Sequence, residues 1–147
     1  MSLMEKLTAD MKEAMKQGEK ERLSVIRLVR GAVRQAEIDG KKTLSDDEVI
    51  GVITKEVKMR RDSIEEFERG KRADLVKKAE EEIALLMPYL PSQLSIDEVK
   101  KIVEETIAEV GATTAKDMGK VMGALMPRVK GRADGKLVNE IVRSILK

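Results

Sequence analysis

The C-terminal part of the chain carries a cluster of cations whose spacing suits contact with phosphate. Lys116 and Lys120 lie one helical turn apart, and a basic turn follows them that holds Arg128, Lys130, Arg132 and Lys136. Lysine and arginine side chains that neutralise phosphates release bound counterions, which favours association with a polyanion. We interpret the cluster as a candidate nucleic-acid-binding surface.

An acid lies within the basic turn of this cluster and complicates its interpretation. Asp134 is the expected N-cap of the last helix. The N-terminus of a helix otherwise welcomes an anion, but a capping carboxylate occupies the first amides and repels phosphate. Direct phosphate contact would then depend on the arginine and lysine side chains.

Two glycines, Gly119 and Gly123, share a predicted helix face with Lys116 and Lys120. Glycine costs a helix about 1 kcal/mol relative to alanine, so two of them on one face need an explanation. Because glycine has no side chain, it lets another backbone come close. That backbone could belong to a neighbouring helix of the same protein, to a second protein, or to a nucleic acid.

A second basic stripe occurs near the N-terminus, where Arg27, Arg30 and Arg34 follow Lys20. At 100° per residue these cations fall in one sector, almost opposite an apolar face that we expect to include Leu28. A solvated helix face is the favoured interpretation of this stripe. Phosphate binding is the alternative.

Arg60 interrupts an apolar stripe, three residues after Val57 and four before Ile64. A charge at such a position must be paired, because burying it alone is costly. We therefore expect Arg60 to form a structural ion pair with an acid from a neighbouring helix.

Catalytic and metal-binding residue types are scarce. The chain has no cysteine and no histidine, which excludes thiolate and imidazole metal ligands, cysteine nucleophiles and every triad that uses histidine as its base. The consecutive acids at 46–48 and 80–82 point in different directions on a helix and make poor metal clusters. We expect no metal, no cofactor and no catalytic activity.

Residues that begin and end helices indicate which predicted helices carry all of these side chains. Capping boxes begin at Ser45 and Ser95, and helices are expected to end at Gly18 and Gly111. Residues 88–94 contain two prolines and cannot form continuous helix. The sequence therefore predicts an all-α protein: a four-helix N-terminal domain, residues 1–90, followed by a small three-helix tail domain, residues 91–147.

Composition agrees with a helical protein that has a highly charged surface. Hydrophobic residues make up 41% and charged residues 38% of the 147 residues, and the net charge is +2. Apolar runs fall short of the roughly 20 residues that cross a bilayer, and the start has no apolar signal core. We expect a cytoplasmic protein with no membrane partner.

Four segments resemble one known family. Residues 116–140, Val25–Arg30, Arg60–Phe67 and Pro88–Leu94 are similar to the YqeY-like family, and the likeness covers essentially the whole chain in order. That family is related to the C-terminal helical region and tail of the GatB subunit of the glutamine-dependent tRNA amidotransferase. The resemblance implies a helical N-terminal domain joined to a three-helix tail.

The resemblance also implies a partner. The corresponding tail of the amidotransferase contacts tRNA, which extends a tRNA-binding expectation to the tail cations, with Asn139 nearby. It implies no catalysis, since the glutaminase and transferase centres lie in parts that this chain lacks. The leading hypothesis is a non-catalytic module that binds tRNA or associates with tRNA-charging or amidotransferase proteins.

Two alternatives stay open at this point. One is a protein-interaction adaptor that uses the Gly119/Gly123 face. The other is a carbon–nitrogen ligase with glutamine as amido-N-donor, an activity that the family association alone suggests.

Overall fold

The computed structural model describes residues 1–146, and every regular element in that range is a helix. The all-α prediction is confirmed. The chain divides into two compact units, Met1–Leu90 and Pro91–Lys147.

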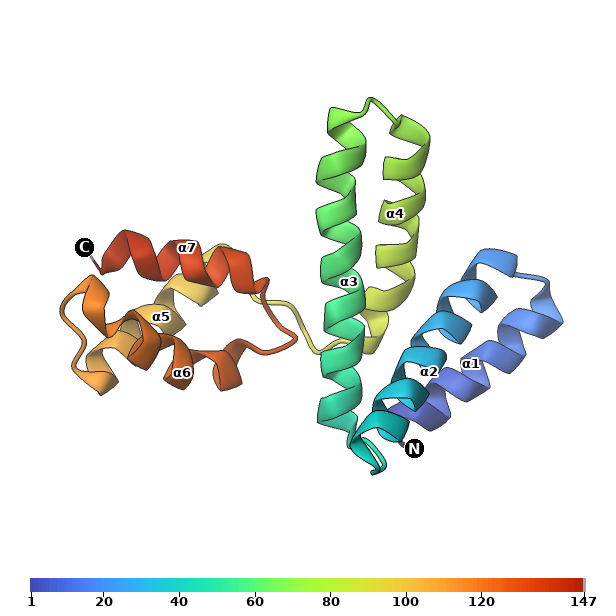
Figure 1. Ribbon diagram of the computed structural model, residues 1–147, viewed down its shortest axis with the longest axis horizontal. Helices are drawn as coiled ribbons and strands as arrows, with labels where there is room; N and C mark the ends of the chain where they lie inside the picture. The colour runs from blue at the N-terminus through green and yellow to red at the C-terminus, as the bar shows by residue number, and fades with distance from the viewer. Residues whose placement is uncertain (147) are drawn as a thin grey trace. The chain divides into compact units, whose positions relative to one another are not determined.

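The first unit contains two helical hairpins (Figure 1). Its elements are α1 (Leu3–Gln17), α2 (Lys20–Gly40), α3 (Asp46–Arg69), α4 (Ala73–Leu86) and a 3₁₀ turn, Met87–Tyr89. At the start of α3, the amide of Glu48 donates to Oγ of Ser45 over 3.3 Å, and the Glu48 carboxylate accepts from the amide of Ser45 over 3.2 Å. This reciprocal pair satisfies two amides that a helix start leaves open.

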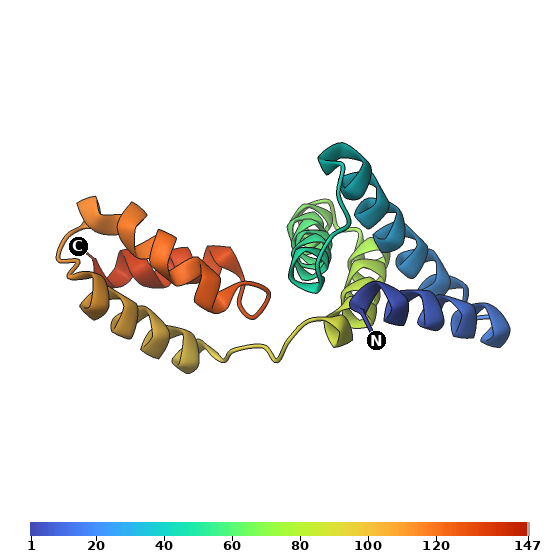
Figure 2. The same cartoon turned by 90° about the horizontal axis from the view of Figure 1, so that it is seen from below.

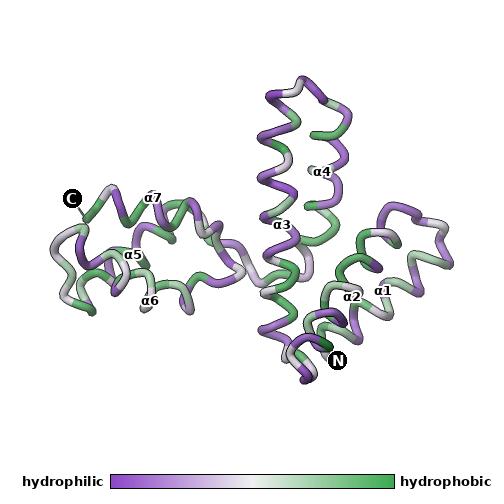
Figure 3. Tube along the Cα trace, in the orientation of Figure 1, coloured by the Kyte–Doolittle hydropathy of each residue, from purple (hydrophilic) through white to green (hydrophobic). Residues whose placement is uncertain are grey.

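The apolar stripes of these helices meet in one core. Figure 3 shows hydrophobic and hydrophilic residues alternating turn by turn along α3 and α4, as amphipathic helices require. The fully buried members include Leu7, Val29, Val33, Ile53 and Leu86.

One prediction about this core was wrong. Leu28 was expected to face inward, but 49% of its surface is exposed, whereas Ile26 is 2% exposed. The buried arc of α2 is rotated toward Ile26, because α1 and α3 pack on that side of the helix.

Tyr89 anchors the end of the first unit to α1. Its ring is buried, and its hydroxyl donates to Oδ2 of Asp10 over 2.5 Å. Burial of the phenol, together with this bond to Asp10, raises the pKa of Tyr89 above its ordinary value. Arg22 lies 3.8 Å from the same carboxylate.

The second unit is a three-helix bundle, seen from a second side in Figure 2. It contains α5 (Ile96–Val110), a 3₁₀ turn (Ala115–Asp117), α6 (Met118–Val129) and α7 (Gly135–Ile145). Its core is separate and includes Val99, Val103, Val121, Leu125, Val138 and Val142. Gly111 ends α5 with φ 67°, a left-handed conformation that glycine adopts without a steric cost.

Segment 92–94 is hydrogen-bonded to the turn between α6 and α7. The amide of Leu94 donates to the carbonyl of Arg132 over 2.8 Å, and the side chain of Gln93 donates to the carbonyl of Gly131 over 2.8 Å. This turn therefore has a defined position in the bundle, and it carries several of the predicted cations.

Candidate nucleic-acid interface

The outer face of α6 carries an exposed line of lysines and small residues. Lys120 and Gly123 are exposed on α6, Lys116 is exposed in the 3₁₀ turn before the helix, and Lys130 is the exposed C-cap residue after it. At a rise of about 1.5 Å per residue, the ten residues from Lys120 to Lys130 span about 15 Å. Within residues 1–146, the side chains of Lys116 and Lys130 form no hydrogen bond and no ion pair.

Both glycines of α6 face open space. A Cβ atom added at Gly119 or at Gly123 would meet nothing within 4 Å. The two glycines therefore do not serve close packing against another helix in the described part of the chain. Of the three explanations that the sequence left open, a partner protein and a nucleic acid remain.

Arg128 does not belong to this surface. Its guanidinium lies 3.2 Å from the carboxylate of Glu105 and 3.6 Å from that of Glu109, and it donates to Oγ1 of the buried Thr106 over 2.8 Å. These contacts hold α6 against α5 and use the charge that was expected to meet phosphate. We therefore remove Arg128 from the candidate interface.

The sequence analysis missed the two glutamates that pair with Arg128. They lie four residues apart on α5, so their shared face was readable from the spacing. The packing of α5 against α6 decides that these glutamates pair with Arg128, and the sequence alone does not show it.

The turn after α6 is less open than its composition suggests. Arg132 is half-buried, and its Nε donates to the carbonyl of Ser92 over 3.2 Å. Asp134 caps α7 by accepting from the amide of Lys136 over 3.0 Å. The N-terminus of α7 is therefore not a backbone phosphate site, while the exposed side chain of Lys136 and the half-buried Asn139 lie on α7 itself.

A second carboxylate borders the lysine stripe. Asp117 accepts hydrogen bonds from the amides of Thr113 and Thr114, over 2.9 and 3.3 Å. These two bonds, with the nearby charge of Lys120, lower the pKa of the Asp117 carboxyl. It therefore stays ionised at neutral pH and partly offsets the charge of Lys120.

The arginine stripe of α2 is broken in the middle. Arg27 and Arg34 are exposed, whereas Arg30 is half-buried and donates through Nη1 to Sδ of Met11 over 3.1 Å. The rotation of α2 that buries Ile26 also turns Arg30 toward α1. The stripe therefore has a gap at Arg30, which separates the exposed Arg34 from the exposed Lys20 and Arg27.

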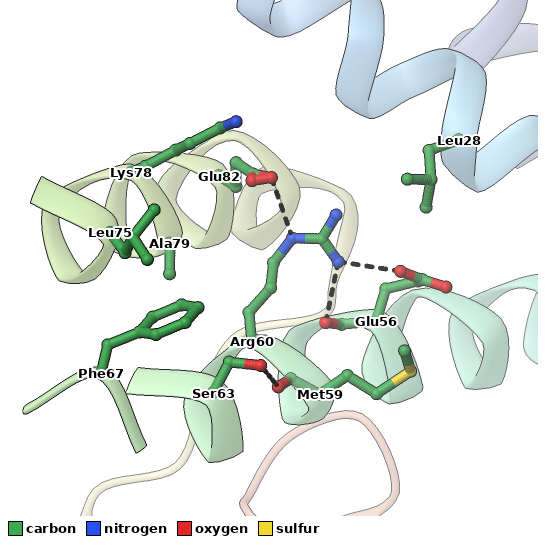
Figure 4. Close-up of a pocket in the computed structure, with 10 residues that line it drawn as sticks. All are labelled: Leu28, Glu56, Met59, Arg60, Ser63, Phe67, Leu75, Lys78, Ala79 and Glu82. Carbon is green, nitrogen blue, oxygen red and sulfur yellow. Dashed lines mark hydrogen bonds and ion pairs between the residues drawn. The ribbon is translucent and has the colours of Figure 1, made fainter. Parts of the chain in front are cut away.

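Arg60 joins α3 to α4 (Figure 4). Its Nη1 lies 2.8 Å from Oε2 of Glu56, and its Nε lies 3.6 Å from Oε1 of Glu82. The Arg60 side chain is only 12% exposed, so this arginine is a structural element of the first unit.

Residues 1–146 contain no group of three or more acidic side chains placed to hold a metal ion. Over the same range, no helix combines the length and the apolar character needed to cross a bilayer.

Comparison with known proteins identifies the family. The sequence model described as "Yqey-like protein" matches residues 4–146. The chain belongs to this family. The YqeY-like resemblance seen in the sequence is thereby confirmed over nearly all of the chain.

Relatives of this YqeY-like protein occur in fungi under the name "Altered inheritance of mitochondria protein 41, mitochondrial". The relative from Pyrenophora tritici-repentis is 33% identical over 80% of this chain and 67% of its own length. The relative from Vanderwaltozyma polyspora is 30% identical over 76% of this chain and 64% of its own, and that from Kluyveromyces lactis is 39% identical over 56% and 45%. This chain thus spans about two thirds or less of these relatives.

The expected cytoplasmic location is corrected by these names. All three relatives are named as mitochondrial proteins, so we withdraw the prediction. It rested on the lack of an apolar signal core, a feature that bears on secretion and says nothing about other compartments.

Proposed function

We propose that this YqeY-like protein is a non-catalytic tRNA-binding module whose contact surface is the outer face of α6. The observation that carries the proposal is the exposed line Lys116, Lys120 and Lys130, interrupted by glycines that face open space. The lysines supply charge, and the glycines let a sugar-phosphate backbone approach the helix.

The charge distribution supports a local contact. The net charge of the whole chain is only +2, so general attraction to polyanions is weak and binding depends on where the cations lie. Arg132 in the turn after α6, and Lys136 and Asn139 on α7, are secondary candidates for the same contact. The names of the fungal relatives describe mitochondrial inheritance and specify no ligand, so the tRNA assignment rests on the surface and on the family's relation to GatB.

A charge-reversal experiment tests the proposal. The variant Lys116→Glu/Lys120→Glu/Lys130→Glu changes the net charge from +2 to −4. Three lost phosphate contacts should reduce the slope of log K against log salt by about 2 to 3. When the salt is raised from about 50 to 200 mM, the loss of tRNA affinity should therefore be roughly 20- to 40-fold smaller in this variant than in the wild type. The measurement is fluorescence anisotropy with labelled bulk tRNA.

The matched control has the same net charge. The variant Lys12→Glu/Lys55→Glu/Lys58→Glu reverses three exposed lysines of the first unit and also reaches −4. The proposal predicts that this control keeps most of the wild-type affinity. Equal losses in the two variants would show that only net charge matters and would contradict a specific α6 surface.

The open glycines also support a second candidate, a protein-interaction adaptor. In this case Gly119→Leu should abolish capture of the tRNA amidotransferase subunits in a pull-down, while Lys116→Ala/Lys120→Ala leaves it intact. The first proposal predicts instead that Gly119→Leu and Lys116→Ala/Lys120→Ala both weaken tRNA binding in the anisotropy assay. A carbon–nitrogen ligase activity would appear as ammonia release from glutamine by the purified protein, and we expect none.

A further inference from the structure

A groove in the first unit takes no part in the proposed tRNA contact. It has a volume of about 410 Å³ and is lined by side chains from α2, α3 and α4 (Figure 4). Its walls combine apolar residues, among them Leu28, Met59 and Phe67, with the ion pair around Arg60.

The apolar part of the groove is open to water. Leu28 is 49% exposed and Met59 is 50% exposed, and they come from neighbouring helices. Single exposed apolar residues are ordinary on protein surfaces, but two that line one concave site can be covered by one apolar group. The rotation of α2 described above is what turns Leu28 into this groove.

Arg60 supplies hydrogen-bond donors that lack acceptors. Nη1 donates to the carbonyl and to the carboxylate of Glu56, over 3.0 and 2.8 Å. Nε is buried and makes no hydrogen bond, because Glu82 is 3.6 Å away. Nη2 is drawn without an interaction in Figure 4 and is not among the buried unpaired atoms, so it remains accessible as a donor.

The charges around Arg60 indicate what kind of acceptor fits. The negative charges of Glu56 and Glu82 already pair with the guanidinium of Arg60. With the positive charge of Lys78, which also lines the groove, these four side chains have a net charge of zero. A further carboxylate would have to approach two existing ones, which is unfavourable at close range. A neutral carbonyl oxygen accepts from Nη2 without that repulsion.

We propose that this groove binds a peptide segment of a partner protein that presents an apolar side chain and a free backbone carbonyl. The side chain covers Leu28 and Met59, and the carbonyl accepts from Nη2 of Arg60. The last turn of a helix offers both features, since its final four carbonyls have no intrahelical partner. The groove is thus a second interaction site, separate from the α6 surface.

A minimal peptide probe tests this site. We would titrate protein carrying ¹³C-methyl-labelled methionine and leucine with N-acetyl-leucine methylamide, which has one apolar side chain and neutral carbonyls. For a ligand of this size, a Kd on the order of 1 mM is expected. The methyl signals of Met59 and Leu28 should shift and saturate. The methyl signal of Met15, which is 53% exposed on α1, should not.

Two further probes separate the parts of the proposal. N-acetylglycine methylamide lacks the apolar side chain, and N-acetyl-leucine carries a carboxylate, so both should bind at least about fivefold more weakly. The variant Leu28→Ser should weaken binding of N-acetyl-leucine methylamide as seen at Met59, while Met15→Ala, a matched change at an equally exposed residue, should leave it unchanged.

Three outcomes would overturn the proposal. The first is equal shifts at Met59 and Met15, which would indicate unspecific apolar contact. The second is tighter binding of the carboxylate probe, which would indicate an anion site. The third is a concentration-dependent shift of Met59 without any probe, which would show that a second copy of this chain covers the groove.

Discussion

Replacing the two glycines of α6 with alanine should affect folding and tRNA binding in opposite directions. Both residues lie in a helix, and a Cβ at either position meets nothing within 4 Å. Adding a methyl group should therefore stabilise the tail unit, because alanine is the better helix former. The same methyl groups would stand between α6 and any backbone that approaches it.

The size of the stabilisation follows from position. Gly123 lies in the interior of α6, so Gly123→Ala should add about 1 kcal/mol to the free energy of unfolding. Gly119 lies in the first turn, where fewer intrahelical hydrogen bonds depend on it, so Gly119→Ala should add about half as much.

Native-state hydrogen exchange reports this change where it occurs. An increase of about 1 kcal/mol slows exchange about fivefold for amides that open with the whole unit. Buried Val121 and Leu125 of α6 are suitable reporters, and buried Val29 of the first unit should not change. Fluorescence anisotropy on the same samples should show weaker tRNA binding by the double variant.

Two results would refute this reasoning. Faster exchange at Val121 and Leu125 would mean that a methyl group is not accommodated, contrary to the open space around both glycines. A stabilised double variant with undiminished tRNA affinity would show that close backbone approach is not needed. In that case the lysines alone, or another surface, would have to account for binding.

Three further predictions test other parts of the structure. Arg60→Ala leaves two largely buried carboxylates unpaired and should cost about 2 to 3 kcal/mol in urea denaturation. Arg72→Ala, which breaks an exposed pair, should leave the free energy of unfolding almost unchanged, and a loss as large as that of Arg60→Ala would contradict the burial of the Arg60 pair. Tyr89 is the only tyrosine in a chain without tryptophan, so absorbance near 295 nm should show that its pKa exceeds the ordinary value of about 10. Because the folded-state pKa is raised, the stability that Tyr89 contributes is complete below about pH 10 and falls as pH rises through the folded-state value; Tyr89→Phe should remove this pH dependence. Asp134→Asn keeps the cap of α7 but removes a negative charge beside the cations. The free energy of unfolding should therefore change by less than about 0.5 kcal/mol, while the affinity for tRNA increases. An unchanged affinity would mean that phosphate binds elsewhere.

The sequence by itself determined the helices and their ends. Ser45 and Ser95 begin capping boxes, and Gly18 and Gly111 end helices in left-handed conformations, as their types predict. These signals are local, because a cap involves only residues within one helical turn. Family membership was also readable from the sequence, since its motifs are linear.

The tertiary structure decided which charged side chains remain available. Arg128 and Lys130 are two residues apart and both carry a positive charge, yet one pairs with α5 and the other faces water. Likewise, Leu28 faces a groove and Ile26 a core, although both are apolar residues of one helix. The period of a helix gives the relative directions of its side chains, but only packing against other helices decides which direction is inward.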